Sequence, residues 1–160
     1  MNRSLLKGFV LCLGLILPMA VVADNMLMGR IALRAEIVLE YVKTSIEEHG
    51  YSVAHTQLCD GGMKDFGYES DVYRVVFFGK LDEVRRAAER HPELVSYLPL
   101  KLAVIAEKNE TLLAVLDPEA LAPFFSDNEV QIQLGRWHND LVSILEDVRR
   151  ATGQRVVATP

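Results

Sequence analysis

Residues 98–125, LPLKLAVIAEKNETLLAVLDPEALAPFF, contain the clearest local pattern of the chain and decide its fold. Two short apolar runs, residues 100–106 and 112–116, are rich in Leu, Val and Ile and are typical of strands with a buried face. The charged residues 107–110 between the runs favour a reversal of the chain. The stretch therefore predicts a hairpin of two antiparallel strands.

A short helix is expected directly after the hairpin. The Asp117 side chain can accept hydrogen bonds from the N–H groups of a first helical turn, and Pro118 suits that turn because its missing N–H would have no partner there. Glu119 adds negative charge near the positive end of the helix dipole. Pro123 then limits the helix to about two turns.

Helical periodicity, apolar runs and residues that favour extended backbone place the elements before the hairpin. Helices are expected at residues 35–49, ended by Gly50 in a left-handed conformation, and at residues 81–90, ended by Pro92. Strands are expected at residues 26–33, 51–58 and 72–78, and the last is almost wholly apolar, which favours a central position. The expected buried stripes are Ile37, Val38, Tyr41, Val42 and Ile46 in the first helix and Leu81, Val84, Ala87 and Ala88 in the second.

The C-terminal region holds the longest regular pattern of the sequence. Ser126 and Glu129 have the spacing of a capping box, which predicts the start of a helix that runs to Arg150 or Ala151. Its apolar stripe consists of Val130, Leu134, Trp137, Leu141, Ile144 and Val148. Two interpretations of the stripe stay open. Either it packs on the protein's own sheet, or Trp137, Leu134 and Leu141 form an interface with a second copy, anchored by Trp137.

The order of the elements mixes hairpins with helices, which favours the α+β class over a parallel, doubly wound sheet. We expect a small, mainly antiparallel sheet of about five strands, with helices packed on one face and a long C-terminal helix. Residues 24–151 are expected to form a single domain of this kind, and residues 152–160 a disordered tail.

The N-terminus has the pattern of a secretory signal peptide, residues 1–23. Arg3 and Lys7 precede the apolar segment 9–17, and small residues follow up to Ala23, after which we expect cleavage. The apolar segment is shorter than the roughly 20 residues that span a membrane, so membrane contact is expected only through this segment before cleavage. An uncleaved anchor is the alternative. The mature protein is expected to be periplasmic or secreted.

The charge of the chain excludes two classes of partner. The net charge is −5, and without Arg3 and Lys7 there are 15 basic against 22 acidic residues. Such a protein lacks the basic surface that displaces counterions from nucleic acid, and it is not attracted to anionic lipid. We therefore expect no nucleic-acid binding and no docking on anionic membranes.

Four motifs stand out between about Ala35 and Phe125. They are Gly50-Tyr51 after a helix, Val76-Phe77-Phe78-Gly79 at the end of a strand, Leu98-Pro99-Leu100 before the hairpin, and Asp117-Pro118-Glu119-Ala120-Leu121. In these motifs the chain resembles the bacterial family called domain of unknown function 302. Lys80-Leu81 stands where many members have Asn-Pro, so no role of that turn is carried over. The resemblance implies a small α+β sandwich that tends to dimerise, and no established biochemical function.

Cys59 is the candidate reactive residue, because it is the only cysteine outside the expected signal peptide and cannot form an internal disulfide there. Asp60 disfavours a thiolate, and no basic residue is adjacent in the sequence. His55 lies on the same face of the expected strand but roughly 13 Å away, too far to share a metal ion with Cys59 without a third element. An inert thiol or an intermolecular disulfide is the simpler interpretation of Cys59, and a surface position that of His55.

The other titratable residues match no known site pattern. His49, His91 and His138 are expected at helix ends or on the polar side of a helix, and the acidic residues of segment 60–71 do not have the spacing of a calcium loop. The sequence contains no motif for c-type haem, for a phosphate loop, for a dinucleotide or for a nucleophilic serine, so no cofactor is expected.

Three hypotheses follow from these patterns. The first is an exported, non-enzymatic binding or accessory module that forms a homodimer and holds a small, apolar ligand between its sheet and its helices. The second is a thiol-dependent enzyme or sulfur carrier that uses Cys59. The third is a structural domain that binds a protein partner through its C-terminal helix, with Trp137 in the contact.

Overall fold

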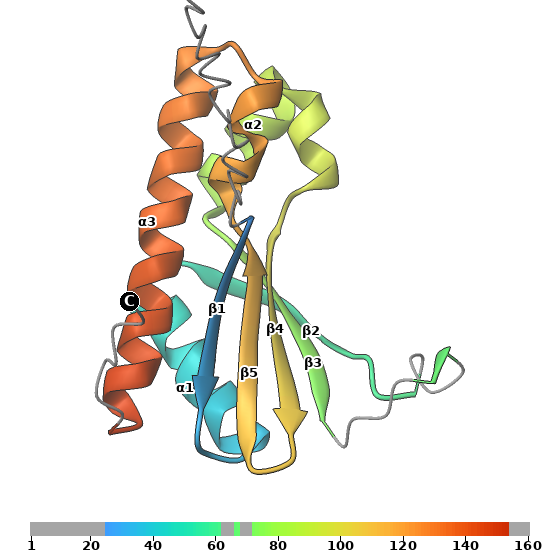
Figure 1. Ribbon diagram of the computed structural model, residues 1–160. Coiled ribbons are helices and arrows are strands. Elements are labelled where there is room, and N and C mark those ends of the chain that lie inside the picture. The colour runs from blue at the N-terminus through green and yellow to red at the C-terminus, as the bar shows by residue number, and fades with distance from the viewer. Residues whose placement is uncertain (1–24, 62–65, 68–71, 154–160) are drawn as a thin grey trace, which may run out of the picture.

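The computed structural model describes residues 25–61, 66–67 and 72–153. They form an α+β domain with a five-stranded antiparallel sheet and a long C-terminal helix (Figure 1), which confirms the expected class. The strands are β1 (Met26–Ile31), β2 (Ser52–Leu58), β3 (Tyr73–Gly79), β4 (Leu100–Glu107) and β5 (Glu110–Leu116). The helices are α1 (Ala35–Glu48), α2 (Leu81–Arg90), α3 (Asn128–Ala151) and the two 3-10 helices η2 (Pro92–Ser96) and η3 (Pro118–Phe124).

The predicted hairpin is confirmed as β4 and β5. Its turn is tighter than the charged segment suggests, because Glu107 pairs with Glu110 and only Lys108 and Asn109 lie between them. The strands follow the order β1-β5-β4-β3-β2, so β4 is the middle strand. The apolar strand β3 lies inside the sheet, between β4 and the edge strand β2.

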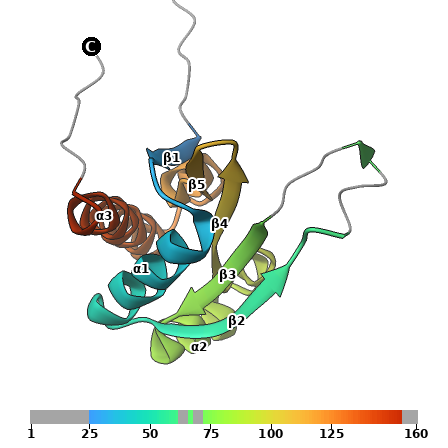
Figure 2. The ribbon, with the colours of Figure 1, turned by 90° about the horizontal axis from the view of Figure 1, so that it is seen from below.

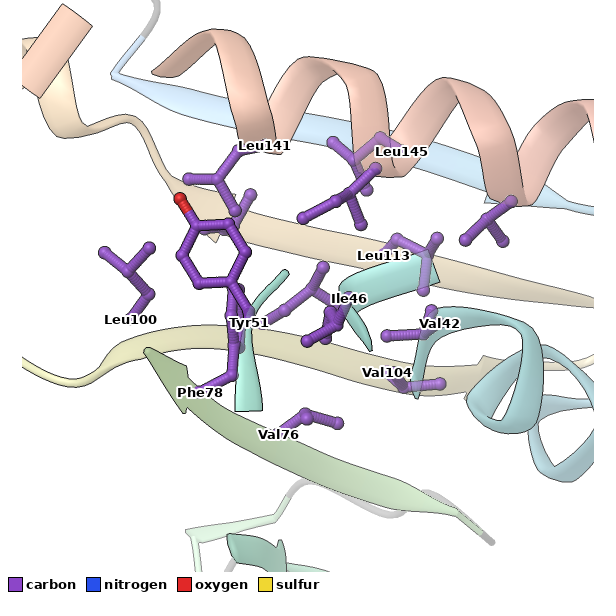
Figure 3. Close-up of a cluster of buried hydrophobic side chains, with 14 of the residues drawn as sticks. Val42, Ile46, Tyr51, Val76, Phe78, Leu100, Val104, Leu113, Leu141 and Leu145 are labelled. Atoms are coloured by element: carbon purple, nitrogen blue, oxygen red, sulfur yellow. The ribbon is translucent and has the colours of Figure 1, made fainter. Parts of the chain in front are cut away.

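One face of the sheet, named here the inner face, is covered by α1 and α3, which lie side by side (Figure 2). Side chains alternate between the two faces along a strand, and Val76, Val104 and Leu113 are buried on this face. They meet Val42 and Ile46 of α1 in the cluster of Figure 3. Complete burial of such a side chain contributes roughly 1.5–3 kcal/mol, so this layer is the main source of the domain's stability.

The buried stripe of α1 is narrower than expected. Val38, Val42 and Ile46 are buried, as predicted, but Ile37 is 47% exposed and Tyr41 is 39% exposed. Successive helical residues are separated by about 100°, so these two residues lie beyond the arc that faces the sheet. Their predicted burial is wrong.

Two expectations at helix starts are also wrong. Leu81 opens α2 but is 69% exposed, and Ala87 is the buried residue of that helix. The cap of α3 is Asp127 rather than Ser126, because the Asp127 carboxylate accepts hydrogen bonds from the N–H groups of Glu129 and Val130. Both residue types are good caps, so the sequence alone could not separate two adjacent candidates.

The apolar stripe of α3 is buried in the protein's own core, against η3, α1 and strand β1. All six of its residues are at most 2% exposed. The burial agrees with the first of the two interpretations, since Leu134, Trp137 and Leu141 belong to the core and a second copy could reach them only if α3 left it.

Two predicted terminal segments lie outside the described residues. These are the signal peptide, residues 1–23, and most of the tail, residues 154–160. Among the last described residues, α3 ends at Ala151, as expected, and Gly153 has a φ of 73°. Within the described part of the chain, no helix is long and apolar enough to cross a membrane.

Candidate functional site

The sheet has a second face, turned away from α1 and α3, which we name the outer face. Its side chains are the neighbours of the buried ones along each strand, and they are half-buried or exposed; Met28 is 57% exposed. At its centre, Ala103 of β4 pairs with Ala114 of β5 and with Val75 of β3. The apolar residues of the outer face are Met26, Met28, Tyr73, Val75, Phe77, Ala103, Ile105, Leu112, Ala114 and Leu116.

Polar groups lie at the two ends of the outer face. At the hairpin end, Arg30 Nε is 3.1 Å from a carboxylate oxygen of Glu107 and 3.1 Å from one of Glu110. At the opposite end, Lys101 Nζ donates a hydrogen bond to the carbonyl oxygen of Tyr97 at 3.0 Å, which holds its charge beside η2. The outer face thus has an apolar centre and a polar rim, as many protein interfaces do.

The outer face is hollowed near Lys101. The hollow has a volume of about 330 Å³, and Met26, Tyr73, Val75, Tyr97 and Ala103 are among its lining residues. This volume is near the lower end of the range of small-molecule sites, which are typically apolar with a few polar groups. The hollow thus combines an apolar lining with the charge of Lys101 at its edge.

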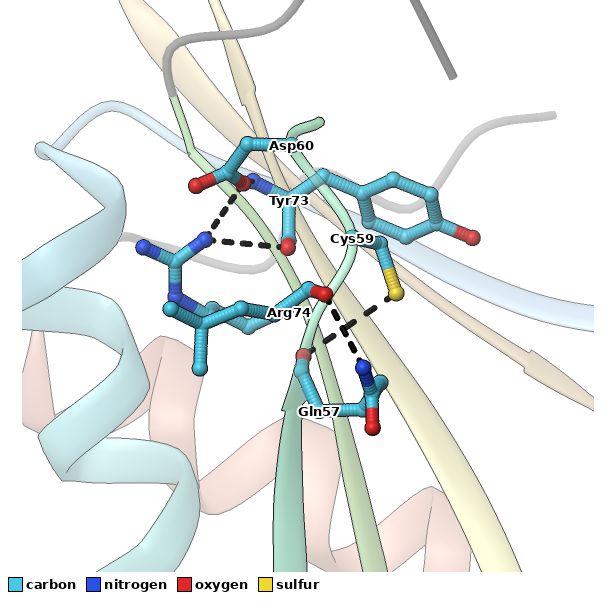
Figure 4. Close-up of polar contacts among 6 residues, drawn as sticks. Gln57, Cys59, Asp60, Tyr73 and Arg74 are labelled. Atoms are coloured by element: carbon cyan, nitrogen blue, oxygen red, sulfur yellow. Dashed lines mark hydrogen bonds and ion pairs between the residues drawn. The ribbon is translucent and has the colours of Figure 1, made fainter. Parts of the chain in front are cut away.

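Cys59 lies at the end of β2 beside a polar corner (Figure 4). Its thiol is free and half-buried, and it lies 4.0 Å from the Gln57 carbonyl oxygen. The Asp60 carboxylate accepts hydrogen bonds from the Tyr73 N–H at 2.6 Å and from the Arg74 guanidinium. The bond from Arg74 lowers the pKa of Asp60 below its usual value. The corner thus joins β2 to β3, and Arg74 forms its ion pair with Asp60.

The other sequence candidate, His55, lies on the outer side of β2. Its ring packs against Phe77 with 6.2 Å between centroids, and Nε2 is 3.2 Å from the Gln57 side-chain oxygen. Neither His55 nor Cys59 belongs to the one group of three close potential metal ligands found among the described residues. The structure does not bring this pair together as a metal site.

The group consists of Asp117, Glu119 and His138, and the sequence does not predict that these residues lie together. Asp117 caps η3, as predicted, and its Oδ1 accepts a hydrogen bond from the Glu119 N–H at 2.9 Å. The same oxygen is 2.9 Å from Nδ1 of His138 on α3. One ligand atom each from Asp117, Glu119 and His138 lies within 4.8 Å of the other two. The Asp-Pro-Glu motif predicts the cap, but no sequence signal indicates that His138, 21 residues away, packs on it.

Lys80, between β3 and α2, takes part in a network that joins three segments of the chain. Its Nζ is 3.1 Å from Asp140 Oδ2 of α3 and 4.3 Å from the centroid of the Tyr51 ring. The Tyr51 hydroxyl donates to the same Asp140 oxygen at 2.6 Å. Burial, and then the Asp140 carboxylate, raise the pKa of Tyr51 far above its usual value. This network fixes the sheet to α3.

Comparison with known proteins supports the fold. The family described as "Domain of unknown function DUF302" matches residues 30–148. A solved structure, the crystal structure of an uncharacterised conserved DUF302 protein from Bacillus stearothermophilus, superimposes with a TM-score of 0.70 at 16% identity. The match covers 79% of this chain and 100% of that one. No curated protein matches the sequence.

Proposed function

The chain belongs to the DUF302 family, and from this premise we propose that it is an exported, non-enzymatic binding module that works as a homodimer through its outer face. The observation that carries the proposal is the outer face itself, a sheet surface with an apolar centre that α1 and α3 leave open. Contiguous apolar patches of this kind on a soluble protein mark interaction sites.

The size of the outer face supports a second copy as its occupant. Five strands spaced about 4.8 Å apart, with about seven residues of roughly 3.3 Å each, cover a plane of roughly 550 Å². Two copies thus bury about 1,100 Å² or more, near the lower limit of about 1,200 Å² for specific interfaces. This estimate favours a reversible dimer, whose population depends on concentration.

The shape of the centre also suits a second sheet. Ala103 and Ala114 face each other across β4 and β5, and such small side chains permit the spacing of about 10 Å at which two sheets pack face to face. Lys101 and Arg30 are held at opposite ends of the face by their own partners. An approaching copy therefore meets apolar groups first.

The ligand is placed differently from the sequence expectation. The space between the sheet and the helices is filled by core side chains such as Phe78 and Trp137. We therefore assign the small, apolar ligand to the hollow of the outer face, which a second copy would close. This arrangement removes both the ligand and the apolar sheet from water.

The non-enzymatic part of the proposal is supported by how the charged groups are used. Arg74 pairs with Asp60, Lys80 with Asp140 and His49 with Asp147, and each pair joins separate elements of the fold. Export is supported by the signal-peptide pattern of residues 1–23. Among the described residues, the polar contact of the Cys59 thiol is the uncharged Gln57 carbonyl oxygen at 4.0 Å.

Native mass spectrometry of the purified protein tests the proposal. We expect a dimer whose share rises with protein concentration, and a dimer peak of higher mass when a co-purifying ligand is retained. A clean monomer without bound mass at all concentrations would count against both the dimer and the ligand.

A further inference from the structure

The group formed by Asp117, Glu119 and His138, named here the Asp117 cluster, combines three segments at one point. Asp117 follows β5, Glu119 lies in the first turn of η3, and His138 lies inside α3. Asp117 is only 8% exposed, His138 is half-buried and Glu119 is exposed. The cluster is thus anchored in the fold and open to solvent on one side.

The donor atoms are of the right kind and spacing for a divalent transition-metal ion. Zn²⁺ and related ions bind imidazole nitrogen and carboxylate oxygen at about 2.0–2.2 Å, so two adjacent ligands are roughly 3.0–3.4 Å apart. His138 Nδ1 and Asp117 Oδ1 are 2.9 Å apart. An ion can therefore take the place of the proton between these atoms with only a small movement.

The third donor can reach the same ion. The Glu119 carboxylate oxygen is within 4.8 Å of the other two ligand atoms, and its exposed side chain is free to rotate. It lies against α3 one turn before His138, because a Cβ built at Gly135 would be 3.6 Å from Glu119 Oε1. Residues three apart share one side of a helix, so Gly135 leaves this side open for the carboxylate.

The charge around the cluster also favours a cation. Within the described residues, neither the Asp117 nor the Glu119 carboxylate has an ion pair with Lys or Arg, and His138 is the partner of Asp117. Two carboxylates with one imidazole are a charge-balanced set for a divalent ion.

We propose that the Asp117 cluster binds one divalent transition-metal ion, represented by Zn²⁺, through His138 Nδ1 and one carboxylate oxygen each of Asp117 and Glu119. The three protein ligands leave at least one coordination position to water. Binding displaces the proton between His138 and Asp117 and ties η3 to α3.

Calorimetric titration of the chelator-treated protein tests this site. We expect one equivalent of Zn²⁺ to bind, and Mg²⁺ and Ca²⁺, which prefer sites made of oxygen alone, to bind at least about tenfold more weakly. Glu119→Gln and His138→Gln should each weaken Zn²⁺ binding at least about tenfold, since even loss of outer partners of a metal site costs that much. The matched control is His55→Gln, which removes an exposed imidazole on β2 and should leave the affinity unchanged.

His138→Gln also removes the bond to Asp117 and can weaken the fold. A second measurement therefore uses the unaltered protein. In NMR spectra of the unaltered protein, the imidazole signals of His138 should shift on addition of Zn²⁺ while those of His55 stay in place. The proposal is overturned if Zn²⁺ does not bind, if Glu119→Gln leaves the affinity unchanged, or if His55 shifts and His138 does not.

Discussion

Replacement of Gly79 by alanine tests the packing between the end of β3 and the start of α2. The added Cβ would lie 2.8 Å from Val84 Cγ2 and 3.9 Å from Pro99 Cβ. The first distance is below van der Waals contact, and the valine cannot move away easily because its branched side chain is stiff. The α2 helix must therefore shift, or the Val84 side chain must leave its preferred rotamer.

The free energy of unfolding should fall by about 1–2 kcal/mol in Gly79→Ala. Overpacking of this kind destabilises by about 1–3 kcal/mol. The alanine also restricts the backbone of the unfolded chain, which stabilises the native state by about 0.4–1 kcal/mol. Val84→Ala alone should cost about 1 kcal/mol, since Val84 is half-buried. In the double variant the methyl groups that obstruct the new Cβ are gone, so the destabilisation by Gly79→Ala should disappear. The coupling energy between the two substitutions should therefore be about 1–2 kcal/mol.

Urea unfolding followed by circular dichroism measures all four proteins of this cycle. We expect equal slopes and a double variant about as stable as Val84→Ala alone. If Gly79→Ala is neutral, or if the two changes add to within about 0.3–0.5 kcal/mol, the described contact between Gly79 and Val84 is not present in solution.

Four further predictions concern single side chains. Tyr51→Phe removes the bond to Asp140, and its free energy of unfolding should be about 1 kcal/mol lower near neutral pH. This difference should shrink above pH of about 10. There, tyrosines of the unfolded chain ionise whereas the buried Tyr51 of the native protein does not, which destabilises only the unaltered protein. Asp60→Asn should lower the free energy of unfolding at neutral pH. The difference from the unaltered protein should vanish as pH falls below about 4, since the bonds of Asp60 stabilise the fold only while its carboxylate is charged. Asp127→Ala should cost about 1 kcal/mol by loss of the α3 cap, whereas Ser126→Ala should be nearly neutral; urea unfolding checks both. Cys59→Ser should leave the dimer mass unchanged, and loss of the dimer would restore a role for this thiol.

The hairpin and the C-terminal helix could be predicted from the sequence because each rests on a local pattern. Residues 100–106 and 112–116 are apolar runs of strand length with charged residues between them, and the β4–β5 hairpin follows from this pattern. The apolar residues of α3, spaced alternately four and three residues apart, identify its buried side. In both cases neighbouring residues along the chain carry the signal.

Contacts between distant segments could not be predicted in this way. Asp60 and Arg74 meet across β2 and β3, and Asp117 meets His138 through the packing of η3 on α3. Such pairs depend on the relative placement of elements, which a single sequence does not contain. The same holds for the outer face, because the apolar run of β4 does not show which of its two faces the helices cover.

The most direct test of the outer face as a dimer interface is the mass of the protein in solution, measured by light scattering over a concentration series. Ala103→Glu places a charge at the centre of the outer face, and Ile132→Glu places the same charge on the solvent side of α3, where Ile132 is 54% exposed. We predict that the unaltered protein and Ile132→Glu form the dimer, and that Ala103→Glu is a folded monomer at every concentration. A dimer that persists in Ala103→Glu, or one that is lost in Ile132→Glu, would contradict the account.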